Sequence, residues 1–181
     1  MIKRVCIYCA SSNRMDGIYS KDAELLGRLL GQKGINVING AGVVGLMGIL
    51  SDAVLSSGGT VTGVIPKFMV DKGLCHPNLT EVIVTDTMHE RKKKMADLSD
   101  AVIALPGGYG TMEELLEIIT WRQLGIFTKP IIILNTLYYY NNLLWTLCQA
   151  VEKKFIREEH AQLWHEAKNP NEVIEILSTF F

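Results

Sequence analysis

The sequence has little net charge and no long apolar run. Its 181 residues include 18 Lys and Arg against 19 Asp and Glu, so the formal net charge is -1. This balance gives no support to a broad cationic surface for DNA, RNA or membrane lipid. No apolar run reaches the length of about 18 residues that a membrane-spanning helix needs, and the first residues lack the apolar stretch of a signal peptide. We therefore expect no nucleic-acid partner and no membrane partner.

Cysteine is scarce and scattered, at Cys6, Cys9, Cys75 and Cys148. Their spread is not that of a dense disulfide framework, so we expect a reduced, cytoplasmic protein. Cys6 and Cys9 have the spacing of a redox motif, but they lie inside an apolar run. Cys75-His76 has no second pair with metal-ligand spacing, so the sequence predicts no metal site. The cysteines are interpreted as buried structural thiols.

Proline is also rare, whereas glycine is frequent, with 5 and 16 residues respectively. Short β-rich runs alternate with helical patterns, and residues 131–134 are apolar at consecutive positions, as in strands covered on both faces. We predict strands over 5–10, 35–39, 60–66, 81–85, 101–105 and 130–135, helices over 19–33, 45–57, 88–99 and 112–124, a loop or lid over 68–80, and helices in most of the remainder.

This alternation implies right-handed crossovers and an open parallel sheet. With no internal repeat or linker, residues 1–181 are expected to form a single α/β domain, Rossmann-like, with helices on both faces of the sheet. Ligands of such sheets bind at the carboxyl ends of the strands, so the loops that follow strands are where a site is expected.

A first glycine-rich loop, Gly40-Ala41-Gly42-Val43-Val44-Gly45, fits the pattern G-x-G-x-x-G of dinucleotide-binding sites. It follows the second strand, however, and no acidic residue stands at the end of the next strand to bind a ribose. Lys67 could pair with a 2′-phosphate, so an NADP-dependent oxidoreductase remains an alternative. The other interpretation is that these glycines only let a helix approach the sheet.

A second glycine-rich loop, Pro106-Gly107-Gly108-Tyr109-Gly110, leaves a buried strand and enters a helix. Its N–H groups and the positive end of the helix dipole suit a phosphate, although the lysine of a P-loop is absent. Thr111 and Glu114 have the spacing of a capping box, which needs no ligand. An extended ligand, with its phosphate on the loop and a sugar that reaches Glu114, explains the same residues.

The charged segment over 88–95 resembles the solvated face of a helix, but helical spacing places its charged residues on two different faces. Arg91 and Lys92 fall on the apolar stripe, and the two lysines that follow fall on the opposite face. An arginine on an apolar stripe needs an ion-pair partner or an anionic ligand. Because this helix also follows a strand, we expect Arg91 and Glu114 to approach each other at one edge of the sheet.

The segments 88–92 and 106–114 resemble the paired motifs of the Lonely Guy (LOG) family, and the likeness covers residues 5–156. Its members are cytokinin riboside 5′-monophosphate phosphoribohydrolases, often labelled lysine decarboxylases. The resemblance implies a Rossmann-like homodimer that acts on a small-molecule nucleoside monophosphate. It hydrolyses the N-glycosidic bond of an adenosine 5′-monophosphate, with or without a modified N6, to free base and ribose 5-phosphate. No metal or organic cofactor is implied.

Matching positions imply that Arg91 and Glu114 are the catalytic pair. Cleavage develops oxocarbenium character on the ribose, which the carboxylate stabilises while it helps to position water. The arginine orients that carboxylate through charge-assisted hydrogen bonds. The resemblance also implies substrate contacts, at Lys92, Gly108, Tyr109, Gly110, Thr111, Met112, Glu113 and Thr120.

The chain departs from the family pattern at Gly40-Ala41-Gly42, at Cys9-Ala10-Ser11-Ser12 and at Gly73, where an acid is expected. These differences leave the identity of the base open. A non-catalytic carrier or sensor of a nucleotide or of molybdenum cofactor, on the same fold, remains an alternative. A decarboxylase is disfavoured because no lysine is marked as a pyridoxal-phosphate anchor. Three residues beside the second loop's helix are expected to support the dimer: Trp121, Leu124 and Phe127.

Overall fold

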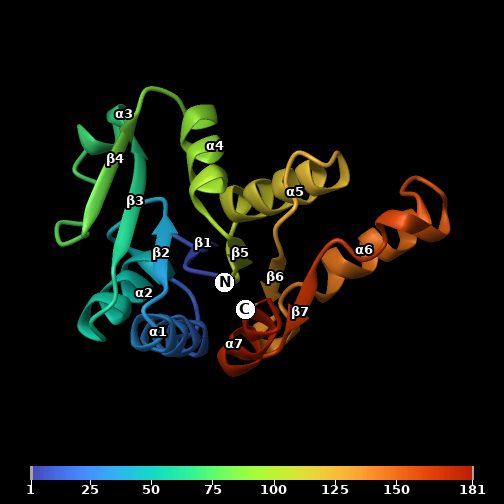
Figure 1. The fold of residues 1–181 in the computed structure, drawn as a ribbon, viewed down its shortest axis with the longest axis horizontal. Helices are drawn as coiled ribbons and strands as arrows, with labels where there is room; N and C mark the ends of the chain where they lie inside the picture. The colour runs from blue at the N-terminus through green and yellow to red at the C-terminus, as the bar shows by residue number, and fades with distance from the viewer. Residues whose placement is uncertain (1, 181) are drawn as a thin grey trace.

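The computed structural model describes residues 2–180, and it confirms the α/β fold expected from the sequence. Seven strands form one parallel sheet with the order β4-β3-β2-β1-β5-β6-β7 (Figure 1). The strands are β1 (Arg4–Tyr8), β2 (Asn36–Asn39), β3 (Val61–Pro66), β4 (Glu81–Thr85), β5 (Ala101–Ala104), β6 (Ile131–Leu134) and β7 (His165–Ala167). The helices are α1 (Gly17–Gln32), α2 (Gly45–Ser56), α3 (Lys67–Val70), α4 (Met88–Leu98), α5 (Tyr109–Gln123), α6 (Asn141–Glu152) and α7 (Pro170–Ser178), with short 3-10 helices η1 (Thr136–Tyr138) and η2 (Glu158–His160).

Helices cover both faces of the sheet, as the sequence predicted (Figure 1). In β1, Val5 and Ile7 belong to the core under α1, α2 and α7, whereas Cys6 and Tyr8 belong to the core under α4 and α5. This division follows from the alternation of side chains along a strand. Because each face must be apolar, the central strands are buried after their first residues and consist largely of consecutive hydrophobic residues.

The order of the strands creates the crevice in which a ligand is expected. Strands β2, β3 and β4 are added on one side of β1, and β5, β6 and β7 on the other. The loops that follow β1 and β5 therefore diverge at the carboxyl edge of the sheet. Open α/β sheets bind their ligands at such a switch point.

The structure differs from the predicted elements in three places. Strand β7 lies in a region expected to be helical, because three residues, two of them polar, are too few to show a period. Helix α5 begins at Tyr109, three residues before the predicted start at 112, with Gly108 as a cap that makes no side-chain hydrogen bond. The spacing of Thr111 and Glu114 is thus not a capping box. The predicted loop over 68–80 also overlaps the short helix α3.

The cysteines match the prediction only in part. All four are free, and Cys6 and Cys9 are buried, which raises the pKa of both thiols. Cys75 is half-buried and Cys148 is exposed, so these two are not buried core thiols. Between residues 2 and 180, no three His, Cys, Asp or Glu side chains gather closely enough to hold a metal ion. Over the same residues, no helix has the length and apolar character to cross a membrane.

Candidate active site

A cavity of about 420 Å³ opens at the carboxyl edge of the sheet, where the loops after β1, β2 and β5 meet helices α3, α4 and α5. It brings together six of the ten residues that the sequence singled out. These are Arg91, Gly108, Tyr109, Gly110, Thr111 and Glu114. The other lining residues are Cys9, Ala10, Ser11, Ser12, Gly40, Gly42, Met47, Met69 and Met88.

Arg91 and Glu114 form a buried ion pair in this cavity, as the sequence predicted. Nη1 of Arg91 donates to Oε1 of Glu114 over 3.1 Å, and the two residues are 7% and 9% exposed. Nε of Arg91 donates to the carbonyl oxygen of Val64 in β3 over 3.0 Å. The guanidinium is therefore held by a strand on one side and orients the carboxylate on the other.

The local sequence explains how Arg91 reaches this position. Helix α4 begins with a capping box, in which Thr87 accepts from the N–H of Glu90 and the Glu90 carboxylate accepts from the N–H of Thr87. This start places Arg91 on the inward face, one turn into the helix. Gly40 makes room for the guanidinium, because a Cβ atom there would lie 1.7 Å from Nη2 of Arg91.

Burial raises the pKa of Glu114 above its ordinary value, because the low-dielectric surroundings disfavour the charged form. The Arg91 guanidinium acts in the opposite direction, while the nearby carboxylate of Glu113 adds to the increase. The site therefore holds a carboxyl group that changes charge at a higher pH than an exposed glutamate. Such perturbed groups in a cavity are candidates for catalysis.

The N-terminus of α5 forms another wall of the cavity. Gly108 caps the helix without a side-chain hydrogen bond, so the N–H groups of its first turn have no acceptor within the helix. Gly107 packs against Thr111, since a Cβ atom on Gly107 would lie 2.1 Å from the threonine Oγ1. The hydroxyl of Tyr139 donates to the carbonyl oxygen of Gly107 over 2.7 Å and supports the loop from behind.

Four of the predicted contact residues do not line the cavity. Nζ of Lys92 donates to Glu113 over 2.6 Å and to Glu117 over 3.0 Å. Burial lowers the pKa of Lys92, but these two carboxylates outweigh that effect and raise it. Thr120 is exposed and its hydroxyl donates to the carbonyl of the preceding helical turn, and Met112 is half-buried among core residues. The cavity is therefore lined by fewer of the motif residues than the resemblance implied.

The first glycine-rich loop is closed to a pyrophosphate. Most of its N–H groups already donate to acceptors of the protein, with Ala41 bonded to Asn39, Gly42 to the sulfur of Met47, and Gly45 to Asn13. A Cβ atom at Gly45 would lie 2.5 Å from the backbone nitrogen of Ser12. These contacts support the interpretation of the glycines as close-packing positions, and they leave the NADP alternative without an open phosphate cradle.

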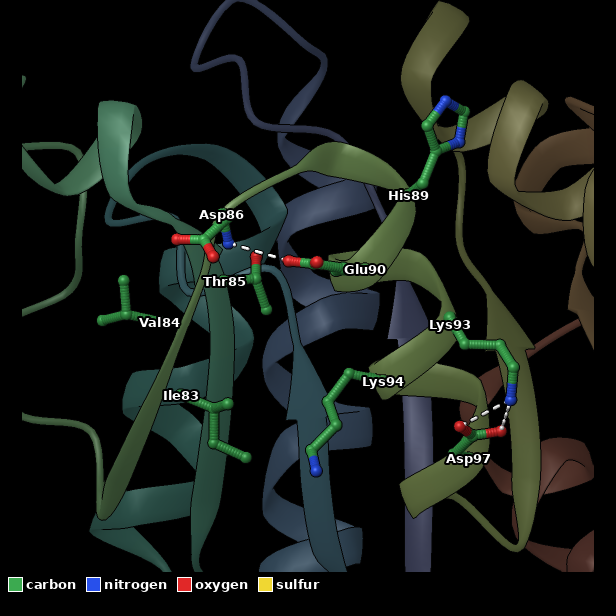
Figure 2. Close-up of a pocket in the computed structure, with 9 residues that line it drawn as sticks. All are labelled: Ile83, Val84, Thr85, Asp86, His89, Glu90, Lys93, Lys94 and Asp97. Carbon is green, nitrogen blue, oxygen red and sulfur yellow. Dashed lines mark hydrogen bonds and ion pairs between the residues drawn. The ribbon is translucent and has the colours of Figure 1, made fainter.

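A larger hollow lies elsewhere and contains none of the predicted site residues. It has a volume of about 600 Å³ and lies between β4 and α4 (Figure 2). Two of its charged side chains pair with each other, Lys93 with Asp97 over 2.6 Å, and the Glu90 carboxylate accepts from the backbone N–H of Asp86. The smaller cavity, which holds the buried ion pair, is thus the better candidate for chemistry.

Sequence reasoning missed several residues of the site. Ser11 and Ser12 line the cavity from the loop after β1, and three methionines line it from α2, α3 and α4. The serines carried a signal, since they follow a buried strand at the expected edge of the sheet. The methionines carried none, because methionine at helical spacing is typical of a core.

Fold and site together define a Rossmann-like α/β protein with a buried carboxylate–arginine pair beside an open helix N-terminus. Residues 47–177 match the family model described as "Possible lysine decarboxylase". The chain is 44% identical, over 98% of its length and 78% of the relative's, to cytokinin riboside 5′-monophosphate phosphoribohydrolase LOG5 of Arabidopsis thaliana. It is 46% identical, over 98% of its length and 73% of the relative's, to the probable enzyme of the same name, LOGL2, of Oryza sativa subsp. japonica. The chain belongs to this family, the LOG family.

The solved structures extend the likeness in fold. The molybdenum cofactor binding protein of Rippkaea orientalis has a TM-score of 0.73 and 21% identity, and the match covers 99% of this chain and 98% of that one. The Moco carrier protein of Chlamydomonas reinhardtii has a TM-score of 0.72 and 20% identity, over 99% and 97% of the two chains. At these identities the comparison establishes the shared fold alone.

Proposed function

We propose that the protein hydrolyses the N-glycosidic bond of adenosine 5′-monophosphate or of an N6-modified relative. Water replaces the base at C1′, and the products are the free base and ribose 5-phosphate. The observation that carries this proposal is the buried ion pair of Arg91 and Glu114 in one cavity with the open N-terminus of α5. The names of the relatives, all phosphoribohydrolases of such nucleotides, support the same reaction.

The 5′-phosphate binds at the N-terminus of α5. The N–H groups of Tyr109, Gly110 and Thr111 are in the first turn and have no acceptor within the helix. They and the positive end of the helix dipole attract an anion, and both line the cavity. Gly108 and Gly110, which line the cavity, have no side chain to keep the phosphate away from the backbone. Tyr109, which is 95% exposed, is free to close over the bound nucleotide.

Glu114 acts on the ribose. Its ionised carboxylate stabilises the positive charge that develops at C1′ as the bond to the base breaks, and it accepts a hydrogen bond from the attacking water. Arg91 holds that carboxylate in place through the bond of 3.1 Å, and its positive charge opposes the increase in the Glu114 pKa that burial causes. The reaction needs no electron transfer, and one water molecule is consumed for each base released.

The geometry does not favour lysine decarboxylation, despite the description of the family model. A lysine that forms a Schiff base needs a neutral amine, and its pKa is lowered for that purpose. Lys92 is the one buried lysine among residues 2–180, and its two carboxylate partners raise its pKa. Its nitrogen also lies outside the cavity that holds Glu114.

We further propose a homodimer and a cytoplasmic location. Four free cysteines fit a reducing compartment. Apolar side chains are exposed near the end of α5 and on α6, among them Leu124, Ile126 and Trp145, with 63%, 63% and 64% of their surface exposed. Trp121 is half-buried beside them, but Phe127 is 5% exposed and belongs to the core, so its predicted part in the interface is wrong.

The test is the release of base and ribose 5-phosphate from AMP and from N6-isopentenyl-AMP. Glu114→Gln keeps the shape of the side chain and the hydrogen bond from Arg91 but removes the negative charge, so activity falls by at least about 100-fold. Calorimetry with AMP shows whether the variant still binds. Unchanged release by the variant would remove Glu114 from the mechanism, and saturable binding by the wild type without turnover would favour the carrier alternative.

A further inference from the structure

Ion pairs join helices α4 and α5 twice beside the cavity. Arg91 and Glu114 form the first link. Lys92, the next residue of α4, forms the second link with Glu113, which precedes Glu114 on α5. The two links therefore pair neighbours on one helix with neighbours on the other. Rotation or sliding of either helix would strain both links, so the second link helps to fix the position of the first.

The ammonium group of Lys92 is directed to α5 rather than to the cavity. Lys92 is 7% exposed, and its Nζ atom donates to Glu113 over 2.6 Å and to Glu117 over 3.0 Å. An ammonium group has three N–H donors, so one remains for any other acceptor. Lys92 does not line the cavity that holds Arg91 and Glu114. This geometry differs from the substrate contact that the family resemblance implies for Lys92.

Three carboxylates gather on the first turns of α5, and they explain why a buried cation is needed there. Glu113 and Glu114 are neighbours, and Glu117 follows Glu113 by four residues, a spacing at which like charges repel. Lys92 lies between Glu113 and Glu117 and offsets their charge. Without this lysine, two carboxylates with no cation would lie beside Glu114.

The charged groups around Glu114 belong to α4 and α5. Burial has the largest effect on the pKa of Glu114 and raises it, and then Arg91 lowers it, Glu113 raises it, Lys92 lowers it and Glu117 raises it. Titratable groups of β1 and of the loop after it also interact with Glu114, but burial raises their pKa values and keeps them neutral. They are Cys6, Tyr8 and Cys9.

We propose that Lys92 is a positioning residue of the hydrolytic site: through its two carboxylate partners it holds Glu114 against Arg91 and offsets the negative charge beside it. This inference rests on the proposed hydrolysis of the nucleotide. Lys92 itself touches neither the nucleotide nor the attacking water. Its effect on the rate follows from geometry, because a displacement of about 1 Å in a catalytic site can cost a factor of about 100.

The experiment is a double-mutant cycle, with AMP or N6-isopentenyl-AMP as substrate, whichever the wild type hydrolyses faster. Lys92→Met keeps an unbranched side chain but leaves Glu113 and Glu117 without their cation, so kcat falls by about tenfold or more. Adding Glu113→Gln restores the net charge that the cluster has in the wild type. In the Glu113→Gln background, Lys92→Met therefore costs less than about threefold.

Lys93→Met is the matched control for the loss of a lysine from α4. Lys93 and its partner Asp97 are both exposed and belong to the same helix, four residues apart. Exposed pairs of this kind contribute little to stability, and this one does not reach α5. We expect kcat and KM of Lys93→Met to equal those of the wild type.

The pH profile of kcat supplies a readout that a purely structural role would not move. The ionised Glu114 is the active form, so the acidic limb follows its pKa. Lys92→Met removes a cation that lowers this pKa, so the limb moves to higher pH. Glu113→Gln removes a carboxylate that raises it, so the limb moves to lower pH. The combined variant returns the limb toward its position in the wild type.

The outcomes separate the two proposals. A wild type that releases base from neither nucleotide overturns the proposed function, and the role of Lys92 with it. An active wild type in which Lys92→Met costs the same factor in both backgrounds leaves the function standing and overturns the positioning role. A KM that rises equally in both backgrounds would assign Lys92 to the substrate and also overturn it.

Thermal unfolding of each variant identifies any loss of folding. Glu113 is exposed, so Glu113→Gln is expected to fold whether or not Lys92→Met does. An acidic limb that stays in place in Glu113→Gln would show that Glu114 does not respond to the charge paired with Lys92. That result alone would overturn the proposal, and a limb moved to lower pH supports it.

Discussion

The carboxylate of Glu114 lies between two opposing influences, and their balance predicts how activity depends on pH. Burial raises its pKa above the ordinary value of 4.5, and the Arg91 guanidinium lowers it. Since the ionised form is the one that stabilises positive charge on the ribose, activity is lost as protons are added. The acidic limb of the kcat/KM profile should therefore lie above pH 4.5.

A substitution of Arg91 tests the direction in which its guanidinium shifts the pKa of Glu114. Arg91→Lys keeps a positive charge but loses the fixed fork that bonds both Val64 and Glu114. With weaker pairing, the pKa of Glu114 rises, so the acidic limb moves to higher pH in this variant. The profile is measured from pH 4 to 9 on protein shown to be folded. A limb that moves to lower pH, or one that is absent in both proteins, would contradict this assignment.

At the scale of elements, the sequence predicted the strands that are long and apolar, and the face of each helix that packs inward. Arg91 could be assigned to the inward face of α4 because helical spacing fixes it. The carboxylate partners of Lys92 could not be predicted, because helical spacing shows which face of α4 the lysine is on but not which side chains of α5 lie opposite it. Strand β7 was missed because its three residues are too few to show a strand period.

The loop before α5 is supported by η1 through a contact between segments that are far apart in the sequence. Tyr139 lies 32 residues from Gly107, and its hydroxyl donates to the Gly107 carbonyl over 2.7 Å. The ring of Tyr139 packs edge-on against Tyr19 and Tyr140, with centroids 6.0 Å and 5.0 Å away. The two residues before it, Leu137 and Tyr138, adopt positive φ values of 50° and 60°, a strained conformation that the surrounding contacts maintain. These contacts hold the Tyr139 hydroxyl at the Gly107 carbonyl.

Tyr139→Phe removes this hydroxyl and keeps the ring. The phosphate loop then loses one support, so KM for the nucleotide is expected to rise about three- to tenfold while kcat changes little, because Glu114 and Arg91 stay in place. Tyr138→Phe is the control, since Tyr138 is 64% exposed and adjoins Tyr139 in the chain. Steady-state kinetics with AMP measure both parameters. Equal KM values for Tyr139→Phe and the wild type would show that the loop does not depend on this bond.

At the scale of the whole molecule, the side formed by α5 and α6 and the β4 edge of the sheet differ in the apolar side chains that they expose. Beyond β5, helices α5 and α6 share a small apolar cavity, and Leu124, Ile126 and Trp145 extend into solvent near it. The edge strand β4 exposes Val82 and Val84, with 42% and 53% of their surface accessible. An edge strand between charged neighbours is common in monomers, whereas several large apolar side chains near one helix are typical of an interface. The α5–α6 side is therefore the expected dimer surface.

The expected dimer surface predicts how a charged substitution changes the mass of the protein in solution. The wild type should elute with the mass of two chains, and Leu124→Glu should shift it toward 20.2 kDa, because a carboxylate cannot be buried in an apolar interface without a partner. The variant keeps its fold, since Leu124 is 63% exposed in the single chain. Val84→Glu places the same charge on β4 and should leave the dimer intact. Light scattering on both variants decides the matter: dissociation by Val84→Glu but not by Leu124→Glu would assign the interface to the edge strand, and a wild type with the mass of one chain would exclude the dimer.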